Sequence, residues 1–319
     1  MKKIEPLSLS GIKTYSLKER RSKVSRQSFG RAWEKGGTFR DFVDRLPDIL
    51  ASRDLREIAA AWVKIRRAKR QVILGMGAHP IKVGLNPVII DLIRRGLITG
   101  VALNGAGIIH DAEIAMAGQT SEDVDQEIGC GRFGMARETA EFLNEAVSWA
   151  GRAGLGLGQA VGRRLLESDF PCKDLSILAA TAAHQVPATV HVAIGTDIIH
   201  LHPSMDPEAL GAATHLDFRL FAALVSELAE GMYLNLGSAV ILPEVFVKAL
   251  TLARNLGHRV ESVTTVNLDF IQHYRPLTNV VRRPTLGTGR GYALTGHHEI
   301  LLPLLAALAA ETWEEDHAH

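Results

Sequence analysis

The hydrophobic pattern changes from helical periodicity near the N-terminus to an alternation of strands and helices. Between residues 39 and 67, apolar side chains recur at intervals of three and four, which predicts helices with a break allowed at Pro47. A short apolar run over 72–77 then ends in glycine, a helical pattern covers 87–95, and a second apolar run covers 100–104. This order predicts a β-α-β unit.

The same alternation continues toward the C-terminus. Helices are predicted at 111–117, 139–167, 175–184, 217–230 and 244–256, strands at 188–194, 232–236 and 259–267, and a glycine-containing loop around 282–290. Strands that alternate with helices favour a parallel sheet with helices on both faces. We therefore expect an α/β fold that binds its ligands beyond the carboxyl ends of the strands.

Composition and charge are those of an ordinary folded protein. The 319 residues are 46% hydrophobic and 22% charged, which is enough for a substantial core. No linker-like stretch divides the chain, so we expect an N-terminal extension over 1–54 and one large domain over 55–319. The net charge of +1 gives no reason to expect a nucleic-acid partner.

Cysteine usage and hydropathy predict a cytoplasmic protein. Cys130 and Cys172 are the two cysteines and do not form a CxxC pair, so neither a disulfide framework nor a thiolate metal site is expected. No stretch approaches the run of roughly 18 apolar residues that a membrane helix needs. We therefore expect no membrane partner.

Glycines and small polar residues stand at the expected carboxyl ends of the strands. Glycine lets backbone N–H groups approach a phosphate or a flat ring, and polar side chains can bond ribose hydroxyls. The candidate cofactor-binding residues are Gly77, Ala78, His79, Asn104, Gly105, Ala106, Thr196, Gly237, Ser238, Thr265 and Val266. No ordered G-x-G-x-x-G opens a helix, so the pattern predicts a nucleotide site without the common Rossmann fingerprint.

Histidines and aspartates accompany these strand ends. An imidazole beside a carboxylate suits proton transfer. The candidate catalytic residues are His110, Asp111, Asp197 and His200. An HxH pair can instead bind zinc, which leaves a metal site as the alternative. Its candidate ligands are His79, His110, His200 and His202.

Several segments, in the same order, resemble the deoxyhypusine synthase family. GTDIIHLH at 195–202 resembles the family's GDMIFFH, LGSAV at 236–240 resembles LGGGVV, and LLPLL at 301–305 resembles LVFPLL. Further matches lie at 81–111 and 263–267, so the resemblance covers roughly residues 70 to 310. It implies a Rossmann-like fold of the deoxyhypusine synthase type, NAD as cofactor, and a homotetramer with active sites at subunit interfaces.

The resemblance fails at residues that the family reaction needs. Deoxyhypusine synthase oxidises spermidine with NAD and passes the butylamine group through an imine on an active-site lysine. The corresponding window, 268–299, contains no lysine. An arginine cannot replace it, because a guanidinium stays protonated and is a poor nucleophile. His110 also replaces a family glutamate and His297 a family aspartate, so we expect that the chain is not a true deoxyhypusine synthase.

Three functions remain open from the sequence. The first is an NAD-dependent oxidoreductase or transferase that acts on an unknown small-molecule substrate. The second is a metal-dependent hydrolase or isomerase that uses the histidine and aspartate residues. The third is a nucleotide-binding scaffold without catalytic activity.

Overall fold

The computed structural model describes residues 3–314, and the chain divides into two compact units, Met1–Arg53 and Asp54–His319. The first unit contains two 3-10 turns, η1 (Leu17–Glu19) and η2 (Arg26–Ser28), and helix α1 (Phe39–Arg45). Thr38 caps α1 in a reciprocal capping box with Asp41. The assignment of 1–54 as an extension and 55–319 as a dinucleotide-binding domain stays a prediction.

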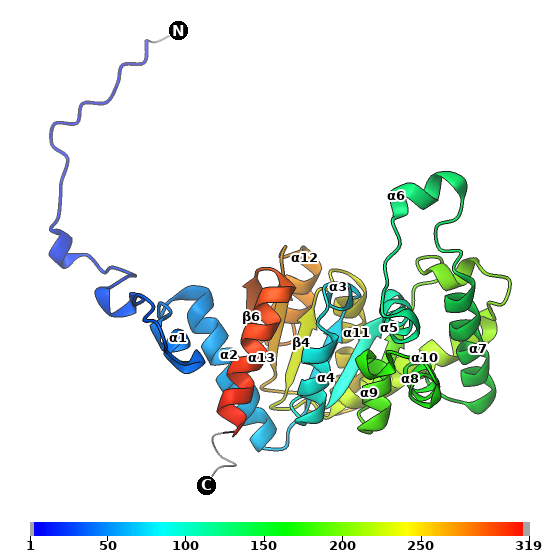
Figure 1. The fold of residues 1–319 in the computed structure, drawn as a ribbon. Helices are drawn as coiled ribbons and strands as arrows, with labels where there is room; N and C mark the ends of the chain where they lie inside the picture. The colour runs from blue at the N-terminus through cyan, green and yellow to red at the C-terminus, as the bar shows by residue number, and fades with distance from the viewer. Residues whose placement is uncertain (1–2, 315–319) are drawn as a thin grey trace. The chain divides into compact units, whose positions relative to one another are not determined.

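Within the described residues, the second unit is built on a six-stranded parallel sheet (Figure 1). Its strands are β1 (Val72–Met76), β2 (Gly100–Asn104), β3 (Ala188–His191), β4 (Met232–Leu236), β5 (Thr264–Asp269) and β6 (Arg290–Thr295). They are arranged in the order β3-β2-β1-β4-β5-β6, and every neighbouring pair is parallel. The chain therefore builds outward from β1 in one direction and then from β4 in the other.

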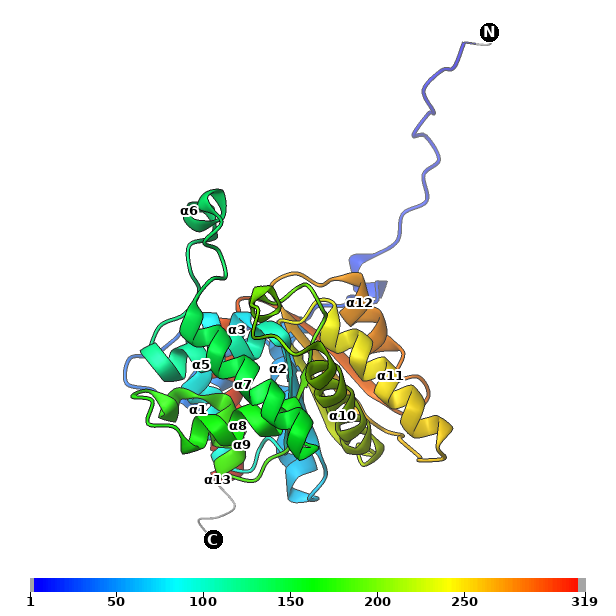
Figure 2. The same ribbon diagram turned by 90° about the vertical axis from the view of Figure 1, so that its right-hand side faces the viewer.

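Helices cover both faces of the sheet, as predicted (Figures 1 and 2). On one face, α10 (Pro207–Ser226) and α11 (Ile241–Asn255) lie side by side. Their apolar side chains meet Tyr233 of β4, which stacks on Phe246 with the ring centroids 3.8 Å apart. The fully buried Trp62 of α2 (Leu50–Arg67) donates a hydrogen bond from Nε1 to the Leu97 carbonyl at 2.7 Å.

The remaining elements connect the strands. They are α3 (His79–Lys82), α4 (Asn86–Arg94), α5 (Gly105–Ala117), α6 (Val124–Glu127), η3 (Ile128–Cys130), α7 (Arg137–Ala153), α8 (Leu157–Glu167), η4 (Lys173–Leu175), α9 (Ile177–Ala183), η5 (Ile198–Leu201), α12 (Tyr274–Pro276), the π-helical η6 (Leu277–Arg282) and α13 (His298–Glu314). None of the helices in residues 3–314 has the length and apolar character that a membrane span requires.

Two predictions of secondary structure were wrong in an informative way. Residue 290, expected in a loop, begins β6, an edge strand in which only Tyr292 and Leu294 are buried, so its apolar pattern is short. The helix expected from residue 111 already begins at Gly105, because the Asn104 side chain accepts the Gly107 N–H at 3.0 Å and caps α5 where β2 ends.

Candidate functional site

The carboxyl ends of β1 and β4 meet at the centre of the sheet, where the strand order reverses. Gly77 follows β1 and Gly237 follows β4. The Gly77 N–H donates to the Leu236 carbonyl at 3.0 Å, and a side chain on Gly77 would overlap the Gly237 carbonyl. Gly237 adopts a φ of +61°, which favours glycine. Parallel sheets of this kind bind their ligands in the crevice beyond such a reversal.

Two histidines from opposite ends of this unit meet beside these glycines. His79 begins α3 and His298 begins α13, and their Nδ1 atoms lie 2.8 Å apart. Gly237 leaves room for the His298 ring, since a Cβ at this position would lie 2.7 Å from Cε1 of the imidazole. His298 is fully buried, whereas His79 is half-buried.

Asp269 and Phe270 complete this cluster at the end of β5. Oδ1 of Asp269 lies 3.7 Å from Nε2 of His298, and the Phe270 ring packs against both imidazoles, with centroids 5.5 and 5.7 Å away. Burial lowers the pKa of His298, and the Asp269 carboxylate opposes this shift. His298, Asp269 and Phe270 were not among the residues predicted from the sequence. These residues lie at or just after the carboxyl ends of β5 and β6. They could have been predicted only if the ends of these two strands had been placed correctly.

Most of the predicted cofactor-binding residues do lie at this carboxyl edge. They are Gly77, Ala78, His79, Asn104, Gly105, Ala106, Thr196, Gly237 and Ser238. Thr265 and Val266 do not lie there, because β5 runs on to Asp269 and leaves them fully buried inside the sheet. Ser238 is 4% exposed, and its Oγ accepts the Leu242 N–H at 3.2 Å at the start of α11.

Asp197 lies against the N-terminus of α5. A side chain on Gly105 would overlap the Asp197 carboxylate, so glycine permits this approach. A carboxylate near a helix N-terminus is electrostatically favourable. Asp197 is 6% exposed, and its Oδ2 has no hydrogen-bond partner among the described residues. Burial raises the pKa of this carboxyl group to about 6.

His200 is held in one orientation by the backbone of its own loop. Its Nδ1 accepts N–H groups from Gly195 at 3.1 Å and Asp197 at 3.4 Å. Neutral His200 therefore carries its hydrogen on Nε2, which is buried and has no partner in the described part of the chain. Burial lowers the pKa of His200. The geometry makes this side chain a hydrogen-bond donor, not a base.

His110 and Asp111 are adjacent in sequence but have separate environments. His110 Nδ1 contacts the Thr120 hydroxyl at 2.6 Å, and that hydroxyl donates to Glu113. Burial, with a contribution from Lys82, lowers the pKa of His110 to about 4.

Asp111 is fully buried and caps α9. Its carboxylate accepts hydrogen bonds from Ser176 Oγ at 2.6 Å and from the N–H groups of Ile177 and Leu178 at 2.8 and 3.0 Å. Burial raises its pKa to about 6. Asp111 therefore stabilises the start of α9, and its side chain is not paired with that of His110.

The histidines of the alternative metal site do not gather around one point. His79 contacts His298, His110 contacts Thr120, and His202 contacts the Gly134 carbonyl at 2.9 Å. Within residues 3–314, no group of three or more histidine, cysteine or acidic side chains has the geometry to hold a metal ion. The metal-dependent alternative therefore gains no support from the geometry.

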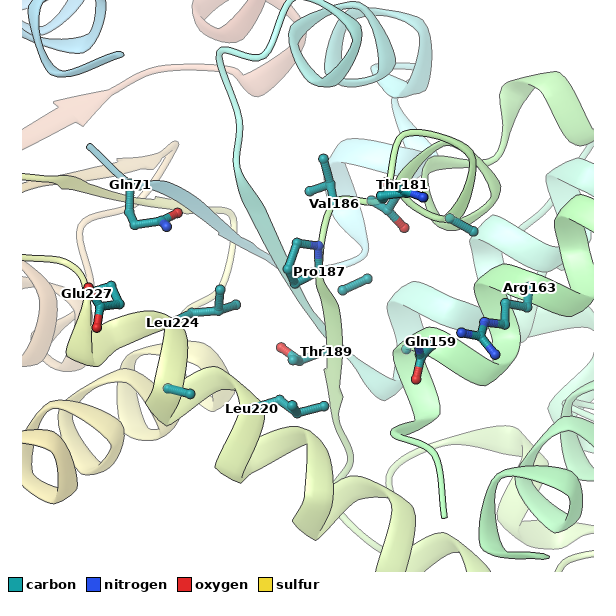
Figure 3. Close-up of a pocket in the computed structure, with 15 residues that line it drawn as sticks. Gln71, Gln159, Arg163, Thr181, Val186, Pro187, Thr189, Leu220, Leu224 and Glu227 are labelled. Atoms are coloured by element: carbon teal, nitrogen blue, oxygen red, sulfur yellow. The ribbon is translucent and has the colours of Figure 1, made fainter. Parts of the chain in front are cut away.

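A cavity of about 610 Å³ lies at the opposite, amino-terminal edge of the sheet (Figure 3). Gln71 and Pro187, which precede β1 and β3, line it together with Gln159, Arg163 and Leu224. None of the candidate catalytic or cofactor-binding residues lines this cavity. The cavity and the histidine cluster are therefore separate features.

Comparison with known proteins gives matches of fold alone. No family model matches the sequence, and no curated protein matches it. A protein assigned as a deoxyhypusine synthase from Entamoeba histolytica superposes with a TM-score of 0.52 at 13% identity, over 88% of this chain and 96% of that chain. The chain has the deoxyhypusine synthase fold. The expected fold class and the resemblance are thereby confirmed at this level.

Two further solved structures share this fold. A conserved protein assigned as LOR/SDH from Methanococcus maripaludis S2 superposes with a TM-score of 0.54 at 15% identity, over 83% of this chain and 71% of that chain. The ternary complex of AgrE with ornithine and NAD⁺ superposes with a TM-score of 0.52 at 19% identity, over 82% of this chain. This chain spans only 33% of AgrE, and 31% of ArgZ, a cyanobacterial arginine dihydrolase that also shares the fold.

Proposed function

We propose that the protein binds NAD in the crevice between the carboxyl ends of β1 and β4 and uses it to oxidise or reduce a small-molecule substrate. The observation that carries this proposal is the strand order β3-β2-β1-β4-β5-β6, whose reversal between β1 and β4 is the usual dinucleotide-binding position. The ternary complex of AgrE, which shares this fold, contains NAD⁺ and supports the same choice of cofactor.

The residues at the crevice have the chemistry that a dinucleotide requires. Gly77 and Gly237 let the ends of β1 and β4 and the His298 ring lie close together, where a Cβ on either residue would overlap its neighbour. Asp197 has a buried oxygen without a partner among residues 3–314, and a carboxylate is a suitable acceptor for ribose hydroxyls. Phe270 is 44% exposed and presents an aromatic ring beside the histidine cluster.

The side chains of residues 268–299 favour oxidoreduction over group transfer through an imine. NAD, when bound, accepts or returns a hydride. Transfer through an imine would need a primary amine, and residues 268–299 contain no lysine. We therefore propose a substrate whose oxidation needs a hydride acceptor and a base, such as an alcohol or an amine.

The resemblance also supports a homotetramer with active sites at subunit interfaces. The cysteine usage supports a cytoplasmic location, and we include both in the proposal. Native mass spectrometry of the purified protein, before and after denaturation, tests cofactor and assembly together. We expect a retained mass equal to that of NAD and a fourfold assembly. Stoichiometric metal without dinucleotide, and no binding of added NAD⁺, would contradict the proposed function.

A further inference from the structure

We propose that His79 is the acid–base group of the reaction and that the buried His298 and Asp269 are the residues that position and polarise it. This inference rests on the proposed function, because it assumes that the chemistry takes place at the crevice between β1 and β4. The arrangement is a linear series of three groups: His79 Nδ1, His298 Nδ1 and Nε2, and Asp269 Oδ1.

The contact between the two imidazoles fixes how many protons they share. At 2.8 Å, the two Nδ1 atoms are at hydrogen-bonding distance, so one of them carries a hydrogen and the other accepts it. If both carried hydrogens, the two N–H groups would point at each other inside the protein. The state of His298 therefore determines the state of His79.

The surroundings of His298 determine which nitrogen carries the hydrogen. Its Nε2 is directed toward the Asp269 carboxylate, with Oδ1 3.7 Å away. Nε2 has no hydrogen-bond partner among the described residues, and the carboxylate that it faces is an acceptor, so neutral His298 holds its hydrogen on Nε2. Its Nδ1 is then a lone pair that accepts the Nδ1–H of His79.

The consequence is that His79 presents an unprotonated Nε2. His298 is 0% exposed and Asp269 is 4% exposed, whereas His79 is half-buried, so a substrate can reach only His79. The distance of 3.7 Å between His298 and Asp269 is longer than a hydrogen bond. Such contacts in free enzymes are often long and shorten when the reacting complex forms.

The proton and electron balance of the step is simple. When an alcohol is oxidised, the carbon-bound hydrogen leaves with two electrons as hydride to NAD⁺, and the hydroxyl proton moves to His79 Nε2. The resulting imidazolium donates from Nδ1 to His298, and the carboxylate of Asp269 stabilises the positive charge through the His298 ring. Reduction runs through the same groups in reverse.

Few charged or titratable groups lie near His79, His298 and Asp269 in the described structure. Glu299, on α13, is 44% exposed in its side chain and lies 3.8 Å from the exposed His297, not in the series itself. Phe270 covers both rings, and Gly237 provides the space in which His298 sits. Asp269 is thus the carboxylate that the geometry places in line with His298.

Labelling with diethyl pyrocarbonate tests the inference without substrate or cofactor. The reagent attacks an unprotonated imidazole nitrogen, and peptide mass spectrometry reports the rate at each histidine. In the wild-type protein we expect His79 to react at its unprotonated Nε2, and the exposed His258 serves as the internal standard. In Asp269→Asn, the side chain can donate to His298 Nε2 as well as accept from it, so the preference for one tautomer is lost and part of the His79 population gains a hydrogen on Nε2. The rate at His79 should then fall severalfold while that at His258 stays constant.

Glu299→Gln is the matched control, since it removes a carboxylate whose charge acts on His298 but which is not in line with Nε2. It should leave the tautomers, and therefore the His79 rate, unchanged. Nitrogen NMR of the wild-type histidines gives a second readout if Asp269→Asn does not fold. We expect His79 to be protonated on Nδ1 and His298 on Nε2. The opposite tautomers, or an unchanged His79 rate in folded Asp269→Asn, would overturn the inference. Failure to bind NAD⁺ with these tautomers intact would instead contradict the proposed function and leave the tautomer assignment standing.

Discussion

The Nδ1 atoms of His79 and His298 lie 2.8 Å apart although 219 positions separate the two residues in the chain. His79 follows the first strand of the sheet and His298 follows the last. They meet because β1 and β4 are neighbours and because α13 returns from the edge strand β6 to contact β5 and α4. The contact is therefore a product of the strand order, and it lies where that order reverses.

Gly237→Ala should disturb this contact directly. The new Cβ would meet the His298 ring, and the residue would keep a φ of +61° that disfavours alanine. We expect a loss of roughly 1–3 kcal/mol in the free energy of unfolding, measured by urea denaturation. Gly211→Ala is the control, because Gly211 lies within α10 with open space around it and should gain about 0.5–1 kcal/mol. Equal effects at the two glycines would contradict this account.

Asp111→Ala should behave as a structural substitution. The change leaves Ser176 Oγ and two buried N–H groups at the start of α9 without their acceptor. We expect a loss of roughly 2–4 kcal/mol in unfolding free energy. Asp174→Asn, at an exposed position nearby in the chain, should change stability by less than about 0.5 kcal/mol. A fully stable Asp111→Ala protein would show that the carboxylate is not a cap.

Asp217 should make the stability depend on pH. It is fully buried and accepts the N–H groups of Gly158 and Val190, each at 2.8 Å, and burial raises its pKa to about 7. The unfolded chain has a pKa near 3.9, so the native state binds the proton more tightly. The resulting stabilisation is present at low pH and is lost as the pH rises through 7.

The comparison with Asp217→Asn isolates this contribution, because the amide does not titrate. Between pH 5 and pH 8, we expect the stability of the wild-type protein to fall relative to that of Asp217→Asn by roughly 2–3 kcal/mol in urea unfolding. A difference that stays constant, or that moves the other way, would mean that the carboxyl group is ionised in the native protein at pH 5.

The sequence predicted the fold class because five of the strands are short apolar runs between helical patterns. It missed the edge strand β6, because exposed Arg290 and partly exposed Gly291 shorten the apolar run in its sequence. The predicted strand also ended at residue 267, two residues before Asp269, whereas the observed strand leaves Thr265 and Val266 buried inside the sheet.

The candidate site could be predicted only in part, for a similar reason. Glycines at strand ends identified the carboxyl edge, and His79 was among the residues named there. The partnership of His79 with His298 depends on strand order, which hydrophobic periodicity does not determine. His110 and Asp111 were proposed as a pair because they are neighbours in sequence. Their side chains have different partners, since His110 contacts Thr120 and Asp111 accepts the Ile177 N–H at the start of α9.

Calorimetric titration with NAD⁺ tests the central claim most directly. Ala78→Tyr would fill the crevice beside β1, and Gln159→Ala, at the amino-terminal cavity, is the matched control. We predict that the wild-type protein binds one NAD⁺ per chain, that Ala78→Tyr weakens binding by about tenfold or more, which is roughly 1.4 kcal/mol, and that Gln159→Ala leaves binding unchanged. No binding by the wild-type protein, or binding sensitive to Gln159→Ala and not to Ala78→Tyr, would contradict a dinucleotide site between β1 and β4.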